Sequence, residues 1–171
     1  MRSLFRENSP DPFSCDTTAR MTKKRGKNNS RKAKPARRAP KRASATPDAL
    51  LAPIKGATAR EVAGVKLEVA PAGQARVKRM IYPPGFRWSK AMKPIVGTER
   101  CMHAHAGFLA RGEIHIEYAD GCVAKYKAPQ VVAIEPGHDG WVVGKEPVVL
   151  IEFDFEGDTV SRLGMPAEHR H

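Results

Sequence analysis

The sequence predicts an all-β fold, an antiparallel sandwich or barrel, for residues 47–171 of this 171-residue chain. Short runs rich in aliphatic and β-branched residues recur at a spacing of about 8–12 residues, which is typical of such folds. Gly, Pro and Asp separate these runs, and no segment past residue 60 keeps the 3.6-residue period of a helix. The pattern therefore favours many short strands joined by turns.

Four runs alternate apolar and polar residues, which is the period of a half-buried strand. They are residues 64–70, 74–81, 113–119 and 148–155. Turns are expected where Pro, Gly and Asp cluster, because these residues adopt turn conformations at low cost. The expected turns are 83–85, 119–121, 135–140 and 144–147, and a short helical turn is expected within 48–62.

A strongly basic segment, residues 1–46, precedes the predicted barrel. It carries 14 of the 30 Lys and Arg but 3 of the 18 acids, so it accounts for +11 of the net charge of +12. After Met21, alanine is its only apolar side chain up to residue 46. Such a composition buries too little surface to offset the entropy of ordering. We expect a disordered basic tail.

Three roles remain open for this tail: weak, salt-sensitive nucleic-acid binding, a solubilising extension, or an import signal. No aromatic residue interrupts residues 21–46, so a base-stacking platform is excluded there. The candidate nucleic-acid contacts are Lys23, Lys24, Arg25, Arg37, Arg38, Lys41 and Arg42.

The sequence also limits the compartment and the chemistry. It has no apolar run of about 18 residues that would predict a membrane span, and no secretory signal. We therefore expect a cytoplasmic protein. It contains no G-x-S-x-G, no P-loop and no Rossmann fingerprint, so hydrolase and nucleotide-binding functions have no support.

Two motifs resemble those of the cupin superfamily. The first is G-T-E-R-C-M-H-A-H from Gly97 to His105, a glycine followed by five residues and H-x-H, with Gly112 closing the strand pair. The second is the Pro-Gly turn in E-P-G-H-D-G-W-V-V-G, which begins at Glu135. With P-P-G-F-R-W-S-K before them, these blocks are similar to one group of small bacterial cupin-domain proteins over residues 83–155. The resemblance implies a jelly-roll β-barrel (a double-stranded β-helix), a homodimer and a small-molecule ligand.

The resemblance also implies a metal site, because alternate strand residues project to one face about 6–7 Å apart. A complete cupin site has two histidines, a Glu four or five residues later, and a His from the second motif. Here Leu109 and Ala110 stand where the Glu would be, and Gly140 stands where the last His would be. His138 precedes Gly140 by two residues and could replace it. The candidate ligands are His103, His105 and His138, for Fe, Mn, Ni or Zn.

Further residues flank the motifs. Cys101 and Glu99 share the parity of the two histidines, so Cys101 is a soft neighbour and Glu99 a substitute for the missing Glu. Asp139 either orients His138 or caps the turn. Three aromatic residues near the motifs, Trp88, Tyr82 and Trp141, either form the wall of a pocket or belong to the core. The candidate pocket residues are Cys101, Trp88, Tyr82, Trp141 and Asp139.

Three functions follow. The first is a cupin barrel that binds a small molecule, with a degenerate metal site. The second is a metal-dependent cupin enzyme of the oxygenase or isomerase class. The third is a nucleic-acid-associated protein that acts through its basic tail. A fold alone does not choose among them.

Overall fold

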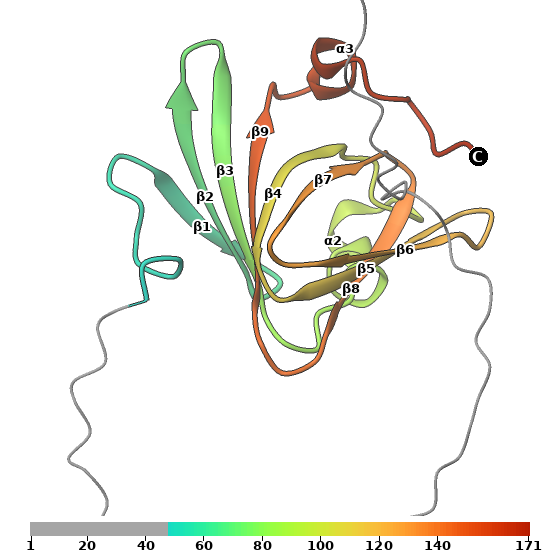
Figure 1. Cartoon of the computed structure of the whole chain (residues 1–171), viewed down its shortest axis with the longest axis horizontal. Helices are drawn as coiled ribbons and strands as arrows, with labels where there is room; N and C mark the ends of the chain where they lie inside the picture. Colours follow the sequence, from blue (N-terminus) through green and yellow to red (C-terminus); the bar gives the residue numbers. More distant parts are fainter. Residues whose placement is uncertain (1–47) are drawn as a thin grey trace, which may run out of the picture.

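The computed structural model describes residues 48–171 (Figure 1). The strands before the first helix are β1 (Thr58–Val62), β2 (Val65–Ala72) and β3 (Ala75–Tyr82). Two short helices follow, α1 (Trp88–Ala91) and α2 (Lys93–Val96). The next strands are β4 (His105–Arg111), β5 (Glu113–Tyr118), β6 (Val123–Lys127), β7 (Gln130–Ile134), β8 (His138–Val143) and β9 (Val148–Asp154), and helix α3 (Thr159–Leu163) ends the series.

The strands form two antiparallel sheets. The larger has the order β1-β2-β3-β9-β4-β7, and the smaller has the order β6-β5-β8. Strands distant in sequence are therefore neighbours, as where β9 pairs with both β3 and β4. The sheets curve around a shared interior (Figure 1), and the apolar core contains buried residues of both. The predicted all-β jelly-roll barrel is confirmed.

The strands predicted from alternation correspond to β2, β3, β5 and β9, with ends shifted by one or two residues. Gly112 lies in the tight turn between β4 and β5 with a φ of 80°, a left-handed conformation that favours glycine. The basic tail, residues 1–46, and its candidate contacts lie outside the described residues.

One local prediction was wrong. The predicted turn at 135–140 ends early, because β8 already begins at His138 and pairs with β5. There, tertiary pairing overrides the local turn signal. The short helical turn expected within 48–62 is present, since Ala52 N donates to Asp48 O, and the segment then continues into β1.

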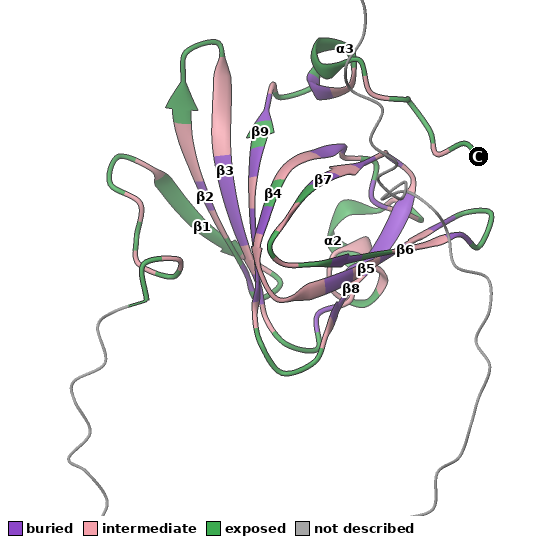
Figure 2. Ribbon diagram, viewed as in Figure 1, coloured by how far each residue is buried: buried purple, intermediate pink, exposed green. Residues whose placement is uncertain are grey.

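The burial of the last three residues of β9 is the reverse of what their composition suggests. Glu152 and Asp154 face the interior and are at most 1% exposed, whereas Phe153 between them is 55% exposed. On the neighbouring β3, Lys78 is also buried. Figure 2 shows buried stretches on both β3 and β9. Because side chains alternate along a strand, this register places charged groups on the inner wall of the barrel.

The chain before β1 covers part of the outer face of the larger sheet. Arg79 donates to the carbonyl oxygens of Leu50 (2.9 Å) and Ala52 (2.6 Å), and it forms a buried ion pair with Glu68. Glu68 in turn accepts a hydrogen bond from Ile54 N at 3.0 Å. These contacts satisfy the buried charges and fix the segment on the sheet. None of the helices within residues 48–171 is long and apolar enough to cross a membrane.

Candidate functional site

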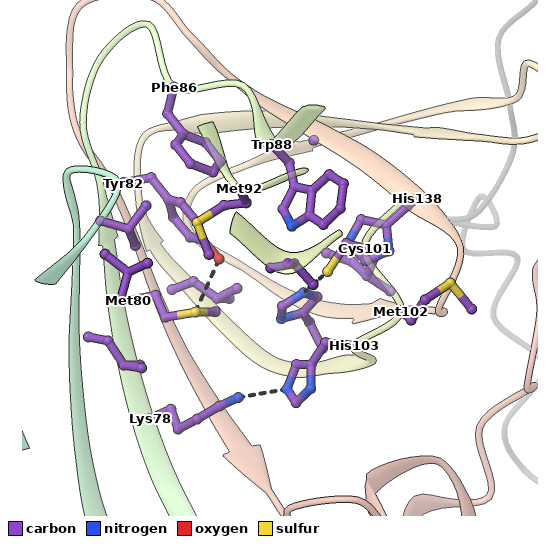
Figure 3. Close-up of a pocket in the computed structure, with 18 of the residues that line it drawn as sticks. Lys78, Met80, Tyr82, Phe86, Trp88, Met92, Cys101, Met102, His103 and His138 are labelled. Atoms are coloured by element: carbon purple, nitrogen blue, oxygen red, sulfur yellow. Dashed lines mark hydrogen bonds between the residues drawn. The ribbon is translucent and has the colours of Figure 1, made fainter. Parts of the chain in front are cut away.

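A cavity of about 650 Å³ opens into the barrel between the two sheets (Figure 3). Most of its wall is apolar and comes from β2, β3, β5 and the α1–α2 segment. Met80, Tyr82, Phe86, Trp88 and Met92 project into it in Figure 3. Its polar end is formed by Cys101, His103, His105, His138 and Lys78.

Backbone pairing fixes two of the polar residues beside each other. Cys101 N donates to His138 O at 2.7 Å, and Gly137 N donates to Cys101 O at 2.7 Å. This isolated bridge joins the segment before β4 to the start of β8. His105, the first residue of β4, points toward the same place, and its Nε2 lies 3.9 Å from Cys101 Sγ.

Cys101, His105 and His138 form a group that can hold a metal ion. Their ligand atoms lie within 4.8 Å of one another, and all three residues are buried. A second group that meets the same distance criterion is His103, His105 and Glu152. The structure thus distributes the three predicted histidines over two overlapping groups.

Hydrogen bonds orient the two buried histidines. His105 Nδ1 lies 2.8 Å from Glu152 Oε2, and His138 Nδ1 lies 2.7 Å from Glu135 O. A carbonyl oxygen can only accept, so His138 Nδ1 carries the proton and donates it there. The carboxylate of Glu152 likewise favours a proton on His105 Nδ1. In the neutral rings, Nε2 is then the free acceptor of each.

His103 lies nearer the surface, where its ring packs edge-on against that of His105, with 5.0 Å between the centroids, and its Nε2 contacts Lys78. Lys78 Nζ lies 2.6 Å from His103 Nε2, 3.1 Å from Glu152 Oε1 and 3.6 Å from Asp154 Oδ1. Burial and the nearby charges of His105 and Lys78 lower the pKa of His103 to about 4. His103 is therefore neutral at pH 7, and its Nε2 accepts a hydrogen bond from the Lys78 ammonium group.

Cys101 and His105 polarise each other. Burial acts to raise the pKa of the Cys101 thiol, but its contacts with His105 and His138 outweigh burial and lower it to about 5. Burial acts to lower the pKa of His105, but Glu152 and Cys101 outweigh it and raise it to about 10. Without a metal, the two side chains therefore form a buried thiolate–imidazolium pair, oriented by Glu152.

Of the five predicted pocket residues, three line the cavity and two do not. Cys101, Trp88 and Tyr82 line the cavity. Trp141 and Asp139 do not, which corrects the sequence-based prediction, because they lie on the outer face of β8, between the inward His138, Gly140 and Val142. The Arg87 guanidinium stacks on the Trp141 ring at 4.5 Å.

Asp139 instead holds the start of α1. Its Oδ1 accepts from Ser89 N at 2.9 Å, and its Oδ2 accepts from Ser89 Oγ and Arg87 Nε, both at 2.8 Å. Since α1 carries Trp88, this contact positions part of the cavity wall. His138 is oriented by Glu135 O and not by Asp139.

Two further residues at the site, Glu152 and Lys78, were not among those predicted from the sequence. Glu99 does not replace the missing carboxylate, since its side chain is 87% exposed and pairs with Lys93 at 2.5 Å. Glu152 reaches His105 from β9, 47 residues further along the chain. The available signal was the alternation in 148–155, where one face of the strand carries two acids.

The fold is a jelly-roll barrel in which the H-x-H segment and β8 bring histidines to an internal cavity. The chain is similar to a Cupin 2 conserved barrel domain protein from Salinispora arenicola, at 15% identity and a TM-score of 0.44, over 67% of this chain and 94% of that one. It is also similar to the Cnp3 cupin domain of Schizosaccharomyces pombe, at 13% identity and a TM-score of 0.41, over 64% and 76% of the two chains.

A third similar structure is AerE from Microcystis aeruginosa, at 16% identity and a TM-score of 0.41, over 58% of this chain and 46% of that one. No protein-family model matches the sequence, and no curated protein matches it. The description as a jelly-roll barrel rests on the strand order of the two antiparallel sheets of this chain.

Proposed function

We propose that the barrel binds a small organic molecule with an apolar body and a polar head group. The observation that carries this proposal is the cavity of about 650 Å³, which is apolar along most of its wall and polar at one end. Ligand sites typically enclose about 300–1,000 Å³ and combine an apolar lining with a few polar groups that fix the ligand's orientation.

The polar end supplies several kinds of hydrogen-bonding partner. Cys101, His105 and His138 supply a thiol and two imidazoles that line the cavity. Glu152 is not among the lining residues; it lies behind them, where its carboxylate contacts His105 Nδ1 at 2.8 Å and Lys78 Nζ at 3.1 Å. Lys78 and His103, at the more exposed side, provide further polar contacts for a head group.

The experiment is a titration with the fluorescent dye anilinonaphthalene sulfonate, which has an apolar body and an anionic head. We expect one dye molecule to bind per chain. Leu67→Trp adds volume to a half-buried residue of the cavity wall, and it should weaken dye binding at least about tenfold, equivalent to roughly 1.4 kcal/mol.

The matched control is Val131→Ser. Val131 is 76% exposed on the outer face of the larger sheet, so this variant separates cavity binding from adsorption to surface apolar groups. Dye affinity that falls in Val131→Ser but not in Leu67→Trp would contradict the proposal.

A metal-dependent enzyme is the second candidate function. The observation that favours it is the convergence of Cys101, His105 and His138 within 4.8 Å beside the cavity. A metal there would polarise a bound carbonyl group or activate a water molecule. Elemental analysis of the purified full-length chain tests this candidate: about one metal ion per chain supports it, and the absence of metal removes it.

Two partner proposals remain from the sequence. We propose weak nucleic-acid binding by residues 1–46, carried by their net charge of +11. A chain that begins at residue 48 should then lose binding to duplex DNA at low salt; unchanged affinity would refute a role of the tail.

We also propose a homodimer. The outer face of the larger sheet exposes Phe108, Val131 and Phe153, and Phe108 and Val131 are directly paired in β4 and β7. Exposed apolar surface of this kind favours association. Sedimentation should show a dimer that Val131→Asp converts to a monomer, and a monomeric wild type would refute the proposal.

A further inference from the structure

We propose that Cys101 Sγ, His105 Nε2 and His138 Nε2 bind one thiophilic transition-metal ion, with zinc as the expected metal. His103 is not among its ligands. The inference deepens the metal-dependent candidate by naming the metal class and the ligand set. It does not depend on the identity of an organic ligand.

The donor atoms are close to a binding geometry. In a tetrahedral zinc site, with Zn–S of about 2.3 Å and Zn–N of about 2.0–2.1 Å, the sulfur and nitrogen ligands lie roughly 3.6 Å apart. Cys101 Sγ and His105 Nε2 are 3.9 Å apart, and all three donors fall within 4.8 Å. Small side-chain rotations would therefore bring the three atoms onto one ion without movement of the strands.

The hydrogen bonds made by Nδ1 of His105 and of His138 favour the same ion position. Metal-binding histidines generally donate their other ring N–H to a carboxylate or a carbonyl oxygen, which fixes the ring. His105 Nδ1 has Glu152 Oε2 at 2.8 Å, and His138 Nδ1 has Glu135 O at 2.7 Å. Both rings are thus held with Nε2 toward Cys101.

In the second group, formed by His103, His105 and Glu152, the Lys78 ammonium group already supplies the positive charge that a metal ion would bring. An ion held by His103, His105 and Glu152 would have to use the side of His105 that faces Glu152. The Lys78 ammonium group occupies that region, since it contacts His103 Nε2 at 2.6 Å and Glu152 Oε1 at 3.1 Å. A metal there would displace the buried Lys78 ammonium group from Glu152 and leave Asp154 Oδ1, 3.6 Å away, as its remaining counter-ion, which is costly.

The donor types select the metal. One thiolate and two imidazoles suit zinc or copper, whereas carboxylates and water suit magnesium, calcium and manganese. Glu152 is engaged with His105 and Lys78, so no carboxylate belongs to the group. A site with two histidines and one cysteine therefore disfavours the hard cations.

The site has the form of a catalytic rather than a structural metal site. Structural zinc sites use four protein ligands, and catalytic sites use three and leave one position open. Cys101, His105 and His138 all line the cavity. The fourth position would face the cavity, where a ligand's polar head or a water molecule can occupy it.

The experiment uses the full-length chain, stripped of metal with a chelator and titrated with Co²⁺, which replaces zinc and gives a thiolate-to-metal absorption band when sulfur is a ligand. We expect one Co²⁺ per chain, the thiolate band, and displacement by Zn²⁺. Cys101→Ser should abolish the band, and His138→Ala should weaken binding more than about 100-fold, since even the loss of an outer partner costs about 10–100-fold.

His103→Ala is the decisive control, because His103 belongs to the H-x-H motif but contacts Lys78. It should keep the band and bind Co²⁺ within a few-fold of wild type. Loss of the band in His103→Ala, its persistence in Cys101→Ser, or no Co²⁺ binding by wild type would each overturn the inference. Dye titration of the same samples keeps this result separate from ligand binding, because cavity binding can persist in a chain that holds no metal.

Discussion

At the scale of single residues, the inner wall of the barrel balances its charges in a chain of contacts. Glu152 is central, because it accepts from His105 at 2.8 Å and pairs with Lys78 at 3.1 Å. Its side chain is 1% exposed. Burial acts to raise the pKa of Glu152, but the charges of His105 and Lys78 outweigh burial and lower it. The carboxylate therefore stays ionised inside the protein.

Removing this carboxylate should be strongly destabilising. Glu152→Ala removes the buried carboxylate partner of His105 and leaves Lys78 with Asp154 alone, and breaking a buried pair from one side costs about 3–5 kcal/mol. Urea unfolding measures the loss. Glu156→Ala is the control, because its carboxylate is 74% exposed and pairs with Arg76 at the surface, where such pairs contribute about 0–1 kcal/mol. Equal effects of the two variants would contradict the assigned register of β9.

At the scale of elements, short helices are positioned by strands rather than by their own sequence. Helix α1 has four residues and is too short to be stable alone. Its Trp88 nevertheless forms part of the cavity wall. What fixes the helix is Asp139 on the outer face of β8, which accepts hydrogen bonds from Ser89 and Arg87.

This contact predicts a pH-dependent stability. Burial acts to raise the pKa of Asp139, but the hydrogen bonds from Ser89 and Arg87 outweigh it and lower the pKa below its ordinary value of 3.8. A lowered folded-state pKa stabilises the protein above the unfolded value, and the contribution is lost as the pH falls through the folded value.

Asp139→Asn should therefore cost roughly 1.5–3 kcal/mol at neutral pH. The difference from wild type should shrink as the pH falls below 3.8, the ordinary carboxyl value. Unfolding free energies measured for both proteins across this pH range check the prediction. A difference that grows toward acid pH would show that Asp139 is not ionised in the contact described.

At the scale of the whole molecule, the strands and their antiparallel arrangement could be predicted because alternation is a local signal. The positions of Cys101, His105 and the inward histidine of β8 followed from strand parity in the same way. Trp141 and Asp139 lie on the outer face of β8 because they alternate with the inward His138 and Gly140, and the turn residues gave no sign that the strand already begins at His138. Local sequence cannot show such a boundary when pairing with a distant strand decides it.

Glu152 and Lys78 illustrate a second limit on what can be predicted from the sequence. Their role depends on β9 lying between β3 and β4, a long-range arrangement that alternation does not specify. The sequence did contain a conflict at β9, since apolar and charged residues alternate there and the apolar ones were the natural choice for the interior. Buried charges that break such a pattern tend to mark functional sites.

The most direct test of the central claim, a ligand cavity lined at its polar end by the Cys101–His105–His138 group, is a high-resolution crystal structure of the protein after soaking with the dye. The account predicts density for the dye's rings against Met80 and Trp88, inside the barrel. Side chains that fill the interior, with the dye seated only on the outer sheet face or not bound at all, would contradict it.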